Sequence, residues 1–166
     1  FLDGTVFSQV GTDLNGMGSA LGDYDGDGDT DWFVTAIYDP DYLCDNVSCG
    51  WGTTGNRLYQ NQGDRAFDDV TDVAGVRDGG WGWGAWFFDP DNDGDLDLVM
   101  TNGVDFPNDE AALFRNDPTR LWRNDGNGRF NELAAELGLD DRGDGRGLLV
   151  FDYDNDGDED VLIVQH

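Results

Sequence analysis

Short β-prone segments alternate with glycine- and aspartate-rich turns along the whole chain. In the first half, strands are expected at about residues 16–21, 32–37, 57–61 and 66–70. In the second half, they are expected at about 82–88, 98–101, 120–124 and 129–133, and another apolar run follows at 161–164. The run NELAAE at 131–136 has helical propensity and its counterpart DDVTDV at 68–73 does not, so at most one turn of helix is expected there. The pattern predicts an all-β fold.

The chain repeats itself, and three acidic segments make the repeat clear: DYDGDGDTD at 23–31, DPDNDGDLD at 89–97 and DYDNDGDED at 152–160. Two glycines stand seven and five residues before each segment, and RLYQN at 57–61 matches RLWRN at 120–124. Units of roughly 60 residues with four antiparallel strands each are typical of β-propeller blades. We therefore expect one partial propeller over 1–166: the end of a blade at 1–10, full blades at 15–78 and 81–141, and half a blade at 145–166.

The most unusual feature of the composition is its excess of acidic residues. The chain has 36 acidic and 9 basic residues, all arginines, and a formal net charge of −27. This balance argues against nucleic-acid binding and against contact with an anionic membrane surface. No apolar run approaches the ~20 residues of a membrane span. Because 16 of the 36 acids lie in the three acidic segments, the charge indicates sites rather than a uniformly acidic surface.

Each acidic segment predicts a Ca²⁺ site between the first and second strand of its unit. Calcium takes six to eight oxygen ligands, and Asp at loop positions one, three and five can supply them from one concave side. Glycine at position six allows the sharp turn that brings later backbone back to the ion. The expected side-chain ligands are Asp23, Asp25, Asp27 and Asp31; Asp89, Asp91, Asp93 and Asp97; Asp152, Asp154, Asp156 and Asp160. The expected carbonyl ligands, at position seven, are those of Asp29, Asp95 and Asp158.

Other metals fit less well. An EF-hand has its bidentate acid at position twelve between two helices, but position twelve here is Val34, Met100 or Ile163, inside an expected strand. Magnesium prefers few carboxylates and keeps its waters. Zinc would require His or Cys, and the sole histidine is His166.

These motifs carry a family resemblance. The pattern G-x-G-x4-D-x-D-x-D-G-D-x-D, followed by a strand and by the segments at 56–61 and 67–71, resembles the FG-GAP or VCBS repeats of calcium-binding β-propellers. It is most similar to proteins like cartilage acidic protein and more distantly similar to the integrin alpha-chain propeller. The resemblance implies calcium ligands at positions one, three, five, seven and nine of each loop. It also implies a ring of usually seven blades, so further chain or other copies are expected to complete the ring.

Cys44 and Cys49 bracket a short loop that a disulfide could close, stabilising the fold by about 2 kcal/mol. A disulfide favours an oxidising compartment, so we expect a secreted, cell-surface or periplasmic protein. Asn46-Val47-Ser48 is a glycosylation sequon, whose use the sequence leaves open.

The expected function is a calcium-stabilised interaction or scaffold module that contacts protein or carbohydrate, with cell adhesion as one setting. Tyr42, Trp51 and Phe106 lie in the segments between the second and third strands and are the candidate partner-binding residues; the alternative is packing within their own loops. Trp81, Trp83 and Trp86 are expected to pack between blades. A structural subunit of a larger assembly is the second hypothesis. An enzyme acting on polysaccharides is the third; we expect no enzyme activity, because the paired acids are already assigned to metal.

Overall fold

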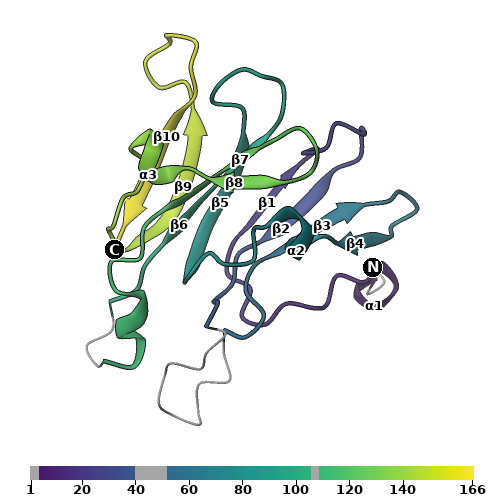
Figure 1. The fold of residues 1–166 in the computed structure, drawn as a ribbon, viewed down its shortest axis with the longest axis horizontal. Coiled ribbons are helices and arrows are strands. Elements are labelled where there is room, and N and C mark those ends of the chain that lie inside the picture. The colour runs from purple at the N-terminus through teal and green to yellow at the C-terminus, as the bar shows by residue number, and fades with distance from the viewer. Residues whose placement is uncertain (1–3, 40–51, 106–108) are drawn as a thin grey trace.

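A computed structural model describes residues 4–39, 52–105 and 109–166. Figure 1 shows three antiparallel sheets standing side by side, in chain order. The sheets contain four, four and two strands, so the predicted all-β class is confirmed. The arrangement is consistent with part of a β-propeller.

The first sheet has strand order β1-β2-β3-β4. Its strands are β1 (Ser19–Gly22), β2 (Asp31–Val34), β3 (Arg57–Asn61) and β4 (Phe67–Asp69). The second sheet has the same order, with β5 (Gly82–Phe88), β6 (Asp97–Asn102), β7 (Arg120–Asn124) and β8 (Phe130–Glu132). The third sheet pairs β9 (Gly145–Phe151) with β10 (Asp160–Gln165). Each strand expected from the sequence is present, with shifts of a few residues at the ends.

A single turn of helix follows the fourth strand of each four-stranded sheet: α2 (Thr71–Ala74) and α3 (Ala134–Leu137). Each ends at a glycine in the left-handed region, Gly75 at φ 83° and Gly138 at φ 74°. The sequence predicted at most one turn of helix at this place, and one turn is present in each case. In the segment at 68–73, where helical propensity is poor, the Thr71 amide donates to the Asp69 carboxylate (3.2 Å), and this local bond supports the turn.

Two further elements complete the described chain. The one-turn helix α1 (Thr5–Ser8) lies 66 residues before α2, so it occupies the same place in the repeat. A 3₁₀ segment, η1 (Asp109–Phe114), lies between β6 and β7. The side chains of Trp81 and Phe114 meet edge to face there, with ring centroids 5.4 Å apart.

The first strands of the three sheets lie next to one another, β1 beside β5 and β5 beside β9 (Figure 1). Glycine makes this close approach possible. A Cβ at Gly18 would overlap the carbonyl oxygen of Trp83, and a Cβ at Gly84 would come within 3.1 Å of the Leu148 backbone nitrogen. Gly18 and Gly84, the second glycines of the pairs before loops one and two, therefore allow sheet to pack against sheet.

Three tryptophans lie in β5 or directly before it, and their environments differ. Trp81 is buried and forms an isolated antiparallel bridge with Ile37, which follows β2 in the first sheet. Trp83 lies under the guanidinium of Arg146 from β9, 4.2 Å from the ring centroid, so it also contacts a neighbouring sheet. Trp86 is 41% exposed. The expected packing between units therefore holds for Trp81 and Trp83, whereas Trp86 is partly exposed.

Candidate metal centres

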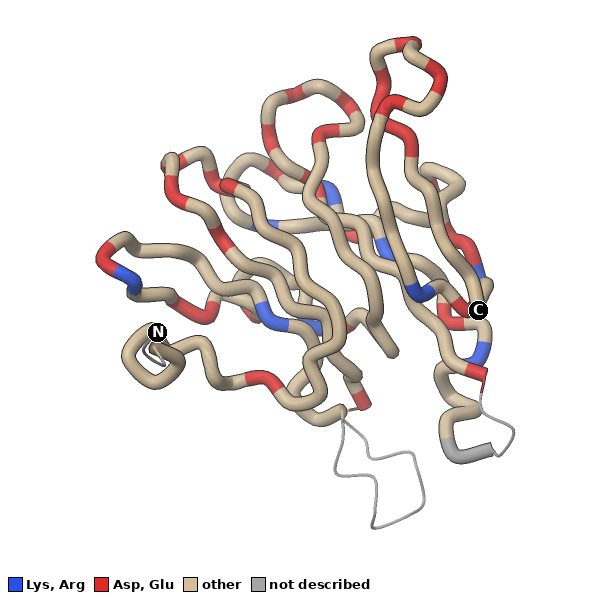
Figure 2. Tube along the Cα trace, turned by 180° about the vertical axis from the view of Figure 1, so that it is seen from behind, with Lys and Arg blue, Asp and Glu red and all other residues tan. Residues whose placement is uncertain are grey.

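The three acidic segments form hairpin loops at one end of the sheets, and Figure 2 shows the acidic residues gathered there. Loop one (residues 23–31) joins β1 to β2, loop two (89–97) joins β5 to β6, and loop three (152–160) joins β9 to β10. Antiparallel strands flank each loop. This is the context expected from the sequence, and it differs from the two helices of an EF-hand.

Carboxylate oxygens converge inside each loop. In every case three acids each contribute one oxygen, and the three oxygens lie within 4.8 Å of one another. The groups are Asp23, Asp25 and Asp27 in loop one; Asp89, Asp91 and Asp93 in loop two; Asp152, Asp154 and Asp160 in loop three. Positions one and three therefore converge in all three loops, as the sequence suggests.

The opening aspartate organises each loop. In loop one, Asp23 accepts hydrogen bonds from the backbone amides of Asp27 (3.0 Å) and Gly28 (3.0 Å). Asp89 and Asp152 accept the same pair of bonds in their loops, at 3.1 to 3.2 Å. These bonds curl the backbone around the carboxylates.

Two loop positions adopt left-handed backbone. Position six is Gly28, Gly94 or Gly157, with φ 92°, 93° and 99°, which explains the glycine that the sequence places there. Position four is Gly26, Asn92 or Asn155, with φ 73°, 56° and 62°. The sequence analysis missed position four. Its signal was present, because Gly and Asn are the residues that enter this region most readily.

The closing aspartates of loops one and two are buried and lie outside the three-oxygen groups. Asp31 is 0% exposed and accepts hydrogen bonds from the amides of Tyr24 (3.1 Å) and Asn61 (2.8 Å). Asp97 is 3% exposed and accepts one from the Asn124 amide (2.8 Å). Burial raises the pKa of each carboxyl to about 6, although these bonds favour the charged form.

Loop three differs at this position. Asp160 is exposed and accepts a hydrogen bond from the Tyr153 amide (2.8 Å). Its carboxylate joins the oxygen group of loop three, in which Asp156 has no part. In the described part of the chain, β10 pairs with β9 alone, so no third strand covers Asp160 as β3 covers Asp31.

The position-seven aspartates are tied to position five. The amides of Asp29, Asp95 and Asp158 donate to the carboxylates of Asp27 (2.8 Å), Asp93 (3.0 Å) and Asp156 (3.0 Å). The use of their carbonyl oxygens as ligands stays a prediction.

Side chains from the third strand also reach the loops, and the sequence analysis missed them. The amide of Gln60 on β3 donates to the Asp25 carboxylate. Its counterpart on β7 is Arg123, whose guanidinium lies 2.8 Å from Asp91 and 3.3 Å from Asp93. The aligned segments RLYQN and RLWRN contained the signal, since they differ at this position by one positive charge.

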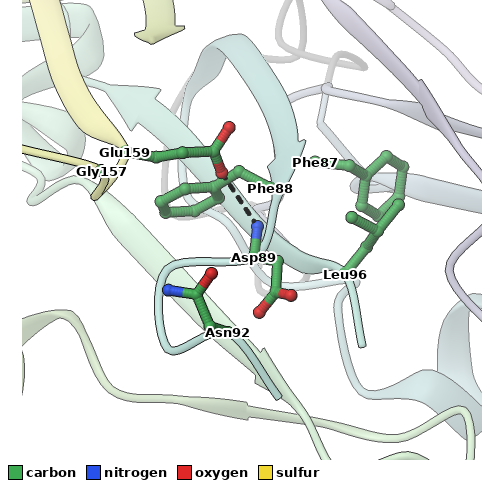
Figure 3. A pocket seen from close by; sticks show the side chains of 7 residues that line it. All are labelled: Phe87, Phe88, Asp89, Asn92, Leu96, Gly157 and Glu159. Carbon is green, nitrogen blue, oxygen red and sulfur yellow. Dashed lines mark hydrogen bonds between the residues drawn. The ribbon is translucent and has the colours of Figure 1, made fainter. Parts of the chain in front are cut away.

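Neighbouring loops are connected to each other. The Asn124 side chain donates to the Tyr24 carbonyl in loop one (2.8 Å) and to the Leu96 carbonyl in loop two (3.2 Å). Between loops two and three, Glu159 accepts a hydrogen bond from the Asp89 amide (3.1 Å), as Figure 3 shows. A cavity of about 280 Å³ lies at this second contact, lined by Phe87, Phe88, Asp89, Asn92, Leu96, Gly157 and Glu159.

The other predicted residues fall elsewhere. The structure does not describe five of them: Tyr42, Trp51, Phe106, Cys44 and Cys49.

None of the helices in residues 4–39, 52–105 and 109–166 is long and apolar enough to cross a membrane.

The donor chemistry of the loops suits a hard divalent cation. Every member of the three groups is an aspartate, so the donors are carboxylate oxygens. Ca²⁺ prefers such oxygens, whereas zinc prefers nitrogen and sulfur. The residues present therefore fit calcium.

Comparison with known proteins bears on the class of fold. The family model of the FG-GAP-like repeat matches residues 108–163, about a third of the chain. The matched segment includes β7, β8, β9 and loop three. No curated protein matches the chain. The match supports the FG-GAP family, the broader class to which the sequence resemblance points.

Proposed function

We propose that this chain is a calcium-binding propeller module in which Ca²⁺ in three hairpin loops stabilises the sheets, and that the module acts as an interaction scaffold. One observation carries the proposal: a three-carboxylate cluster that includes positions one and three occurs on the same kind of hydrogen-bonded hairpin three times, at one end of the molecule. In each loop the aspartates at positions one, three, five and nine would hold the ion, together with the position-seven carbonyl. Position nine of loops one and two and position five of loop three lie outside the converging groups, so ion binding would draw these carboxylates closer.

Repulsion gives the ion its structural role. Two carboxylates about 5 Å apart repel by roughly 3 kcal/mol at an effective dielectric near 20. Backbone amides satisfy part of this charge, as at Asp23, but they carry only partial charges. A divalent cation removes the repulsion and connects the two ends of the hairpin.

The expected affinity suits an extracellular setting. Extracellular calcium modules bind with dissociation constants of about 10⁻⁴ to 10⁻³ M. At ~1 mM calcium, mass action then stabilises the fold by about 0.4 to 1.4 kcal/mol for each site. A secreted, cell-surface or periplasmic location and a protein or carbohydrate partner belong to the same proposal.

Calcium removal tests the proposal. Three sites together should contribute about 1 to 4 kcal/mol, which corresponds to a Tm roughly 3 to 15 °C higher in 1 mM calcium than in excess chelator. Magnesium at the same concentration should raise the Tm less. The double variant D25N/D27N should lose part of the calcium effect, while D105N/D140N, with equal charge change outside the loops, should keep it. An identical melting curve with calcium and with chelator, together with no heat of binding by calorimetry, would refute the proposal.

A second candidate function, a subunit of a larger assembly, is favoured by the third sheet. Leu149, Phe151, Leu162 and Val164 are exposed on one face of β9 and β10. The corresponding face of the second sheet is covered, because Phe88 and Val99 pack in a cluster with Leu148 and Val150 of the third. Sedimentation velocity tests this candidate: an assembly well above 18.3 kDa supports it, and a monomer at every concentration counts against it.

A further inference from the structure

The three loops share one hydrogen-bonded backbone, but the third strand contributes differently to each. Arg123 brings a guanidinium to loop two, and Gln60 brings a neutral amide to loop one. In the described part of the chain, loop three receives no such side chain, since β10 pairs with β9 alone. The loops are therefore unequal in charge although their acidic segments are nearly identical.

We propose that Arg123 acts as an internal cation of loop two, which competes with calcium and makes this loop the weakest of the calcium sites. The inference rests on the proposed calcium function. It concerns the order in which the three loops bind calcium.

The contacts explain the competition. One guanidinium nitrogen of Arg123 contacts Asp91 and Asp93, two of the three acids whose oxygens converge in loop two. Calcium that uses both carboxylates must displace the guanidinium or share their oxygens with it. Two partly exposed ion pairs of this kind should weaken binding about tenfold.

Gln60 has the opposite character. A glutamine amide is neutral, and it can turn its carbonyl oxygen toward a cation. A guanidinium has five donors, no acceptor and a permanent positive charge. The same position on the third strand therefore tolerates calcium in loop one and opposes it in loop two.

The difference gives loop two its own behaviour without metal. Arg123 offsets part of the repulsion between Asp91 and Asp93, so loop two should keep its shape at low calcium. Loop one lacks this charge and should gain more order than loop two when calcium binds. Loop one should also bind calcium before loop two.

Reciprocal exchange of the two side chains tests the inference. R123Q gives loop two the side chain of loop one, and Q60R does the reverse. R142Q is the matched control, because it removes an equal charge from a side chain that is 59% exposed and pairs with Asp140 outside the loops. Calcium is titrated into the full chain, and the amide signals of Gly28, Gly94 and Gly157 are followed by two-dimensional NMR, one signal for each loop.

The expected midpoint for Gly94 in the unmodified chain is about tenfold higher in calcium than the midpoint for Gly28. R123Q should lower the Gly94 midpoint about tenfold, Q60R should raise the Gly28 midpoint by a similar factor, and R142Q should move either less than twofold. If calcium binds but both exchanges leave the midpoints unchanged, the inference is overturned while the proposed function stands. If no glycine signal moves in any variant, both are overturned.

Discussion

Replacing Tyr24 by alanine tests how loop one is held against the second sheet. Tyr24 is at position two of its loop and is 4% exposed. Its ring stacks on Phe87, with centroids 6.4 Å apart, and lies 5.6 Å from the ring of Phe130. Its carbonyl accepts the hydrogen bond from Asn124. The side chain thus joins a loop of one sheet to two strands of the next.

The magnitude follows from burial. Removing a buried aromatic ring leaves a cavity and typically lowers the free energy of unfolding by about 3 to 5 kcal/mol. For a domain of this size that loss corresponds to a Tm decrease of roughly 6 to 20 °C. The chain offers a matched control at position two of loop three, where Tyr153 is 75% exposed. The Y153A variant should change stability by less than about 0.5 kcal/mol.

Urea denaturation in saturating calcium, followed by tryptophan fluorescence, measures both variants. Y24A should also weaken calcium binding at loop one, because the Tyr24 amide donates to Asp31 and the ring fixes that part of the loop. The reasoning fails if Y24A and Y153A lose similar stability, since the two tyrosines then share one environment.

Two further predictions concern the third strand and pH. N124A should lower the free energy of unfolding, measured by thermal melts, by about 2 to 4 kcal/mol, because the Asn124 side chain donates to carbonyls in two loops. N61A should lower it by only about 1 kcal/mol, because the Asn61 side chain donates to the Thr30 carbonyl of one loop. Asp31 and Asp97 each have a folded pKa of about 6, above the unfolded value near 3.9, so the folded state binds more protons between pH 7 and pH 5. In excess chelator, acidification from pH 7 to pH 5 should therefore raise the free energy of unfolding by about 1 kcal/mol for each of these residues.

Each of these has a contrary outcome. Equal losses for N124A and N61A would mean that the bond between loops adds nothing to stability. A calcium-free protein whose urea midpoint falls steadily between pH 7 and pH 5 would show that the buried carboxyls do not take up protons in the folded state.

The sequence alone determined the local features of the fold. Strand positions followed from β-prone runs between turn residues, and the repeat located the loops between first and second strands. Glycine at position six correctly indicated a sharp turn, which the structure shows as left-handed backbone at Gly28, Gly94 and Gly157. The convergence of positions one and three also followed from spacing within nine residues.

Two features depend on contacts that the local pattern does not show. The helical turn at Thr71–Ala74 formed although its propensity is poor, because the Asp69 carboxylate supports it. Position five of loop three, Asp156, is not part of the converging group there, while Asp160 is.

Only the tertiary structure decided which copies of a repeated residue are buried. Tyr24 and Tyr153 stand at the same loop position, as do Asp31 and Asp160, yet the first of each pair is enclosed and the second is exposed. Burial depends on strands that come from distant parts of the chain, such as β3 over Asp31 and β8 beside Tyr24. The reach of Arg123 into loop two has the same origin, because a side chain meets a loop about 30 residues away only after the strands have paired.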